Sequence, residues 1–102
     1  MAVSTLKDAR EIDAGLYHPT SGIPAGGYVD IDIPFNRTFT TPPHVVVGFS
    51  TASTEGGFGK CCCSVKYVNG VGPAVTTTGF TLRAFNGDTI GRSPNYTWIA
   101  IA

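Results

Sequence analysis

Apolar and polar residues alternate one by one in several short segments of this chain. Residues 28–33 show the pattern most clearly, with Val, Ile and Ile on one face and Tyr, Asp and Asp on the other. A period of two is typical of a β-strand with one buried face, because successive side chains of an extended chain point to opposite sides. The same alternation recurs in residues 79–85, and the segment 96–102 closes the chain. We expect a strand at each of these places.

Two further segments read as strands for other reasons. Residues 44–49 contain three successive valines, which predicts a strand whose two faces both lose contact with water, one inside the domain and one against a neighbour. Residues 61–68 are rich in Val, Tyr and Cys and end at Asn69-Gly70, a strong hairpin signal. Residues 71–75 form the expected return strand, weakened by Gly72 and Pro73.

The remaining segments are dominated by turn formers. Thirteen glycines and seven prolines interrupt the chain, and no long stripe of helical period is present. We expect loops at 18–27 and 50–59 and a turn at 86–88, whereas residues 2–16 form either an edge strand or an ordered arm. The prediction is an all-β fold, a six- to seven-stranded antiparallel β-sandwich. The 102 residues form one domain, with an arm and loop at 1–25 and the sandwich core at 26–102.

The charge balance excludes several kinds of partner. Seven Lys and Arg residues face seven Asp and Glu residues, so the net charge is zero and no basic patch for nucleic acid is expected. No apolar run approaches the roughly 20 residues of a membrane-spanning helix, and the first residues lack the apolar core of a signal peptide. We therefore predict no membrane insertion, synthesis in the cytoplasm, and export by a non-classical route or by release from damaged tissue.

Residues that could carry catalysis have simpler explanations. Asp30 and Asp32 share one strand face and could form an acid and base pair, but such carboxylates usually form a solvated face. The consecutive cysteines 61–63 are more often small core residues than nucleophiles, and their spacing does not suit one tetrahedral metal ion. We predict that the protein is not an enzyme, has no disulfide framework, and needs no cofactor and no metal.

A set of motifs in the second half is similar to the H-type lectin family, which includes snail agglutinins and the C-terminal domains of discoidins. The matching residues, in chain order, are Phe39, Pro42-Pro43, Val45, Val47, Val75, Gly79-Phe80, Asp88-Thr89, Ser93 and the closing Trp98-Ile99-Ala100-Ile101. The resemblance covers roughly residues 26–102. It implies a six-stranded sandwich, a trimer built along one sheet, and recognition of galactose or N-acetylgalactosamine where subunits meet.

The resemblance also points to particular residues. The family's first binding loop falls on Gly26, Gly27 and Tyr28, where its Arg and Asp are absent and Asp30 is the nearest acid. The neighbouring chain's basic residue maps to Lys60 or Lys66, and the last loop places Asn86, Gly87 and Arg92 at family positions. Asp88 either caps its own turn or accepts sugar hydroxyls. The predicted sugar-binding residues are Gly27, Tyr28, Asp30, Lys60, Lys66, Asn86, Asp88 and Arg92.

These observations predict a lectin without catalytic activity that binds terminal galactose-type sugars. Hydrogen bonds to sugars are weak, about 0.5–1.5 kcal/mol each, because water is displaced. Three sites on one trimer, or six on a dimer of trimers, would raise avidity by roughly 10² to 10⁴. The alternative is a trimeric receptor-binding or structural tip domain of a viral or phage fibre, because phage tail-fibre tips share the Phe-x-x-Pro-Pro-x-Val entry.

Overall fold

The computed structural model describes residues 11–18, 22–49 and 60–102. Within these ranges the chain forms β-strands and no helix. The strands are β1 (Ile12–Tyr17), β2 (Tyr28–Pro34), β3 (His44–Phe49), β4 (Cys61–Val65), β5 (Tyr67–Val68), β6 (Gly72–Pro73), β7 (Gly79–Asn86) and β8 (Tyr96–Ile101).

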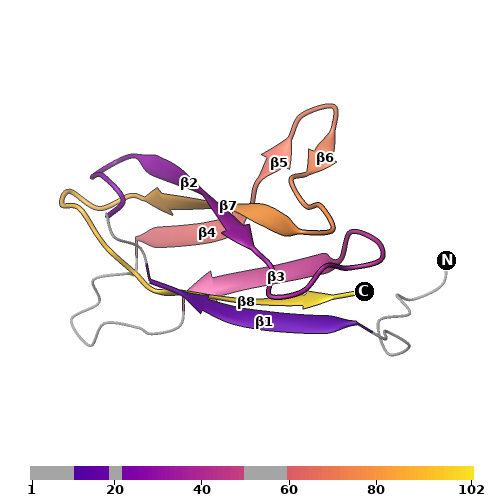
Figure 1. Cartoon of the computed structure of the whole chain (residues 1–102). Helices are drawn as coiled ribbons and strands as arrows, with labels where there is room; N and C mark the ends of the chain where they lie inside the picture. The colour runs from indigo at the N-terminus through magenta and orange to yellow at the C-terminus, as the bar shows by residue number, and fades with distance from the viewer. Residues whose placement is uncertain (1–10, 19–21, 50–59) are drawn as a thin grey trace, which may run out of the picture.

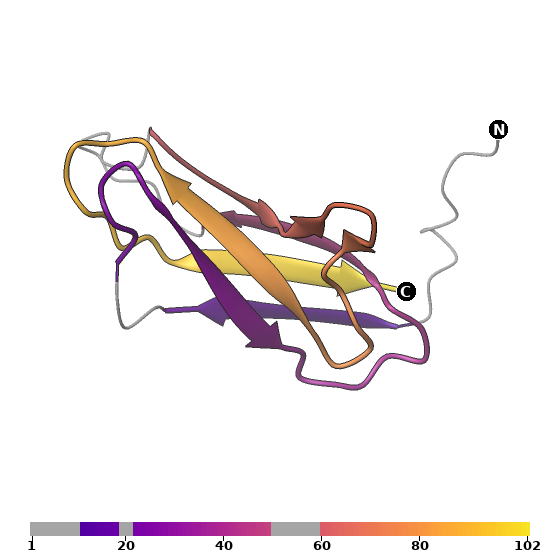
Figure 2. The ribbon, with the colours of Figure 1, turned by 90° about the horizontal axis from the view of Figure 1, so that it is seen from above.

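The strands form two layers. One three-stranded sheet has the order β1-β8-β3, the other has the order β2-β7-β4, and every pairing is antiparallel. Figure 1 shows the two sheets stacked, with the small β5-β6 hairpin projecting from the β2-β7-β4 layer. Seen from above in Figure 2, the strands of the two layers cross obliquely. The predicted all-β, sandwich-like antiparallel fold is confirmed.

The core lies between the sheets and is dominated by their central strands. Alternate residues of β7 and β8 are buried, as a period of two requires when one face of each sheet is covered. The Trp98 indole lies 5.5 Å from the Phe35 ring and 5.7 Å from the Phe80 ring, measured between centroids. Trp98 is only 3% exposed, so it packs in the core and offers no surface for a ligand.

Close packing of Trp98 explains a glycine in the edge strand β1. Gly15 lies directly opposite Trp98 in the β1-β8 ladder. A Cβ atom at this position would lie 2.6 Å from the Trp98 ring, far inside van der Waals contact. The indole therefore occupies the space that any other residue at this position would need.

Strand boundaries differ from the prediction in two places. The arm expected at 2–16 forms the edge strand β1 at its C-terminal end, while residues 1–10 and the expected loop 50–59 lie outside the described residues. The strand expected at 61–68 divides at Lys66, whose N–H donates to Thr81 O while its carbonyl accepts from Ala74 N. The 61–68 segment thus leaves the sheet at Lys66 and continues into the hairpin.

The hairpin itself is shorter than expected. The return strand is only Gly72–Pro73, because Gly72 has a φ of 116° and Pro73 has no N–H to donate. Gly70 has a φ of 82°, whereas Asn69 has a negative φ. A type I′ turn needs positive φ at both central residues, so the Asn-Gly pair forms a different turn, closed by Val71 N–H donating to Val68 O.

One face of the β1-β8-β3 sheet points away from the core and carries mostly aliphatic side chains. We call this surface the apolar face. It is formed by the outward residues of the three strands, namely Ile12, Ala14, Leu16, His44, Val46, Gly48, Thr97, Ile99 and Ile101. Val46, the middle valine of the predicted two-faced strand, is 68% exposed in the single chain, while Val45 and Val47 pack toward the core.

Candidate ligand-binding site

The outward surface of the β2-β7-β4 sheet has a different composition, and we call it the polar face. Strand register aligns its residues in three rows across the sheet. Tyr28 lies opposite Phe85, Asp30 opposite Arg83, and Asp32 opposite Thr81. Cys62 and Ser64 extend the first two rows onto β4. These residues share one face because each lies two positions from the next along its strand.

Asp30 is the centre of an ion-pair cluster on the polar face. Its two carboxylate oxygens accept from Arg83 Nε at 2.7 Å and from an Arg83 terminal nitrogen at 3.0 Å. Lys66 Nζ lies 3.1 Å from Asp30 Oδ2. The Arg83 hydrogen bonds, helped by Lys66, lower the pKa of Asp30 to about 2, and Asp30 in turn raises the pKa of Arg83. Asp30 and Arg83 are therefore both charged at neutral pH.

Two exposed aromatic rings lie beside this cluster. Tyr28 is 54% exposed and Phe85 is 43% exposed, and they face each other across the β2-β7 ladder. The Arg83 guanidinium carbon lies 4.3 Å from the centre of the Tyr28 ring, so the same arginine joins the aromatic row to the charged row. The polar face thus combines ring surfaces with fixed hydrogen-bonding groups.

A second group of predicted residues gathers at the end of this sheet. Asn86 N–H donates to Gly27 O at 2.8 Å, and Gly87 N–H donates to Lys60 O at 2.8 Å. The loop before β2, the start of β4 and the loop after β7 therefore converge within one chain. The resemblance assigned the first of these to one subunit and the other two to its neighbour.

Asn86 has a structural role, which corrects its prediction as a sugar-binding residue. The residue is completely buried, and its Nδ2 donates to Ile23 O at 3.1 Å and to Ile90 O at 2.8 Å. Its Oδ1 accepts from Asp88 N at 2.9 Å and from Cys61 Sγ at 3.5 Å. All four hydrogen-bonding positions of the amide are occupied, so the side chain has nothing left for a ligand.

Of the two roles that the sequence left open for Asp88, the structure shows the turn cap. Its Oδ1 accepts from Thr89 N at 2.7 Å, which caps the local turn. Its Oδ2 accepts from Arg92 at 2.7 Å and 3.0 Å. The Arg92 hydrogen bonds lower the pKa of Asp88, with a smaller contribution from the charge of Lys60. Asp88 and Arg92 hold each other, and their side chains are less exposed than those of Asp30 and Arg83.

The eight predicted residues therefore fall into two groups. Tyr28, Asp30 and Lys66 belong to the polar face, whereas Gly27, Lys60, Asn86, Asp88 and Arg92 belong to the loop end. Arg83 and Phe85 are central to the polar face but were not predicted. The sequence could have pointed to both residues, because they alternate with the buried residues of 79–85 and therefore lie on the outward face.

The described residues contain no second candidate site built from the cysteines or from metal-binding side chains. Cys61 and Cys63 are partly buried, and burial raises the pKa of both thiols, that of Cys63 to about 11. In the part of the chain that the structure describes, no group of three or more His, Cys, Asp or Glu residues is arranged to hold a metal ion. The described residues also include no helix long and apolar enough to span a membrane.

Comparison with known proteins returns no matching family model, and neither a curated protein nor a solved structure matches the chain significantly. The similarity to H-type lectins accordingly stays a prediction based on the motifs quoted above. The functional argument has to come from the geometry of the polar face.

Proposed function

We propose that this protein is a carbohydrate-binding lectin without catalytic activity that recognises terminal galactose-type sugars on its polar face. The observation that supports the proposal is the exposed Tyr28–Phe85 pair beside the Asp30–Arg83–Lys66 cluster. A hexose has ring C–H groups on its faces and hydroxyls on its edge, so it needs an aromatic surface and charged hydrogen-bonding groups close together.

The two parts of the cluster would contact different parts of the sugar. The Tyr28 and Phe85 rings lie under the C–H face, which is broadest in galactose because its axial 4-hydroxyl leaves the opposite face free. Arg83 keeps N–H donors that Asp30 does not use, and Lys66 has two further donors beyond its bond to Asp30. Because the ion pairs already fix these groups, little side-chain entropy is lost when a sugar binds.

The charged state of the cluster supports binding rather than hydrolysis. A glycosidase acid must carry a proton near neutral pH, which requires a raised pKa. Asp30 has a pKa of about 2, and Asp32 accepts from Thr81 Oγ1 at 2.7 Å. Asp30 is thus held as an anion and is suited to orient Arg83 and Lys66 rather than to transfer a proton.

The apolar face supports the multivalent part of the proposal. Four large aliphatic residues on it are between 48% and 68% exposed in the single chain, namely Ile12, Leu16, Val46 and Ile99. Contiguous apolar surface of this kind is typical of protein interfaces. We take the assembly to be a homotrimer. Since the apolar and polar faces lie on opposite sides of the sandwich, each polar-face site is complete within one chain, which differs from the predicted placement at subunit junctions.

Calorimetric titration of the purified protein with galactose and with N-acetylgalactosamine tests the proposal. Tyr28→Ala should weaken binding by about tenfold or more, because it removes the stacking ring and the partner of Arg83. Asp30→Asn should weaken binding by a similar factor, since Arg83 and Lys66 lose their anchor. Tyr67→Ala is the matched control, because Tyr67 is also an exposed tyrosine but lies on the hairpin. Absence of binding to either sugar would overturn the proposal.

A second candidate function is the trimeric tip domain of a viral or phage fibre. The exposed aliphatic residues of the apolar face favour it as well, because a fibre tip also requires symmetric assembly. The two functions separate on one observation. A fibre tip with a structural role assembles through the apolar face and shows no sugar binding that depends on Tyr28.

A further inference from the structure

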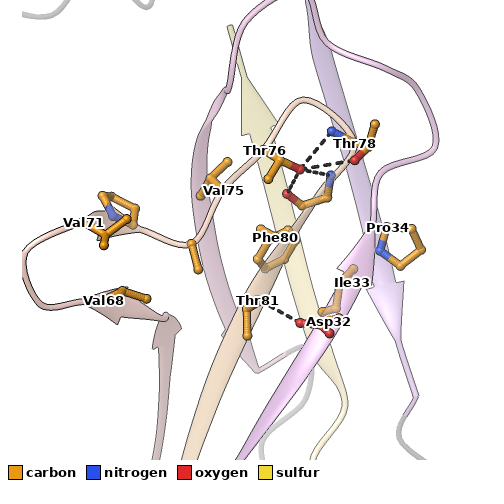
Figure 3. A pocket seen from close by; sticks show the side chains of 13 residues that line it. Asp32, Ile33, Pro34, Val68, Val71, Val75, Thr76, Thr78, Phe80 and Thr81 are labelled. Carbon is orange, nitrogen blue, oxygen red and sulfur yellow. Dashed lines mark hydrogen bonds between the residues drawn. The ribbon is translucent and has the colours of Figure 1, made fainter.

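A groove lies between the β5-β6 hairpin and the paired strands β2 and β7, away from the Tyr28–Phe85 row. Its volume is about 590 Å³, within the range of small-molecule sites. Figure 3 shows Val68 and Val71 of the hairpin on one side and Asp32, Ile33 and Pro34 on the other, with Phe80 between them. The lining is therefore mainly aliphatic and aromatic.

Asp32 is the exception to this apolar lining. Of the described residues that line the groove, Asp32 alone is ionisable. Its Oδ1 accepts from Thr81 Oγ1, as the dashed line in Figure 3 shows, and Thr81 is neutral. No described Lys, Arg or His lies within ion-pair distance of Asp32, in contrast to Asp30 two residues earlier, which has two cationic partners.

The opposite end of the groove is closed by a saturated turn. Thr76 Oγ1 accepts from Thr78 N and from Gly79 N, both at 3.2 Å, and lies 3.1 Å from Gly79 O. Thr76 therefore has no remaining capacity to bind a second polar group. Thr78 lies three positions before Thr81, which corresponds to roughly 10 Å along an extended chain.

We infer that this groove binds small amphipathic amines, with the ammonium group on Asp32 and a hydrocarbon chain of about six carbons along the apolar lining. A carboxylate without a cationic partner at the edge of an apolar groove favours a ligand that carries a positive charge on an apolar body. The saturated turn favours a chain without a polar group at its far end. This inference is independent of sugar binding.

Titration of the ¹⁵N-labelled full chain with n-hexylamine, followed by NMR, tests the inference. Hexylamine should shift the amide signals of residues 68–76 and 79–81 with a Kd of roughly 1 mM, as expected for a ligand of this size. The neutral 1-hexanol and the anionic hexanoate, which share its chain length, should bind at least about threefold more weakly, because an ion pair of this kind is worth a few-fold in affinity.

Three variants separate the charge from the apolar lining. Asp32→Asn keeps an acceptor for Thr81 and should weaken hexylamine binding by roughly threefold to tenfold while leaving 1-hexanol unchanged. Val71 is 81% exposed and thus unimportant for folding. Val71→Ser should weaken the binding of both hexylamine and 1-hexanol, because it removes apolar lining. Asp13→Asn, which removes the same charge from the other sheet, should change neither.

The inference is overturned if 1-hexanol binds as tightly as hexylamine, if Asp32→Asn has no effect on hexylamine, or if the shifted signals lie outside the groove. Loss of sugar binding by Tyr28→Ala would have no bearing on these results. The two sites can therefore fail separately.

Discussion

The polar face and the apolar face each belong to a sheet of three antiparallel strands, yet the exposed positions of the two sheets carry opposite chemistry. On the polar face, Asp30 forms ion pairs with Arg83 and Lys66, and all three side chains stay partly exposed to water. On the apolar face, the side chains of Val46 and Ile99 have no hydrogen-bonding groups, yet they are 68% and 48% exposed. The sandwich thus presents hydrogen-bonding groups on one outer surface and exposed aliphatic side chains on the opposite one.

This difference shows what alternation does and does not determine. A period of two fixes which residues point outward but leaves their chemistry free. Apart from Asn86 at the end of β7, the residues pointing inward on β7 and β8 are apolar or aromatic, because both inner faces meet in one core. The outward residues are the ones that distinguish a ligand surface from an assembly surface.

The largest expected effect comes from placing a charge on the apolar face. If the protein forms the proposed trimer, Ile99→Asp, at the centre of β8, should convert it into monomers, because assembly would bury three carboxylates without partners. Light scattering measures the mass directly. Ser64→Asp adds the same charge to the polar face and should leave the mass unchanged. An unassembled wild-type chain, or an Ile99→Asp protein of unchanged mass, would contradict the role we give this face.

A smaller effect is expected inside the sheet that carries the apolar face. Gly15→Ala should lower the free energy of unfolding by about 1–3 kcal/mol, because the new methyl group overlaps the Trp98 ring. For a domain of this size the Tm should fall by roughly 5–20 °C. Gly48→Ala in β3, the other edge strand of the same sheet, is the matched control, since a Cβ there meets nothing within 4 Å. Equal Tm values for the two variants would argue against this packing.

The smallest effect concerns the polar face and its dependence on pH. The folded-state pKa of Asp30, about 2, lies below its ordinary value of 3.8, so its ion pairs add stability that is present above about pH 5 and is lost as the pH falls toward 2. The loss should not exceed about 1 kcal/mol, because the cluster is open to water.

Thermal unfolding between pH 2 and pH 6 measures this dependence. The Asp30→Asn variant should lose less stability than the wild type over the same range. Parallel curves for the two proteins would show that Asp30 does not contribute to acid sensitivity.

The sequence predicted the strands well where alternation or a run of valines marked them, as in residues 28–33, 44–49 and 79–85. It did less well at the hairpin, where the φ of Gly72 ends the return strand after two residues. A glycine tolerates many conformations, so its φ depends on surroundings that a local pattern does not contain.

The candidate site was only partly predictable for a related reason. Asp30 and Arg83 are 53 residues apart, and their pairing depends on the register between β2 and β7, which no local pattern encodes. Asn86 was assigned to the site because the resemblance placed it in the last binding loop, whereas here its amide is buried and donates to the carbonyls of Ile23 and Ile90 from two separate loops. Lys66 follows the last residue of β4, and from this position its Nζ reaches Asp30.

The most direct test of sugar recognition on the polar face is an NMR titration of the ¹⁵N-labelled wild-type chain with N-acetylgalactosamine. The account predicts saturable shifts of the backbone signals of Tyr28, Asp30, Arg83 and Phe85 and of the Arg83 side-chain Nε–H signal, with the apolar-face signals of Val46 and Ile99 unmoved. Shifts confined to the loop end or to the apolar face, or no shifts at saturating sugar, would contradict it.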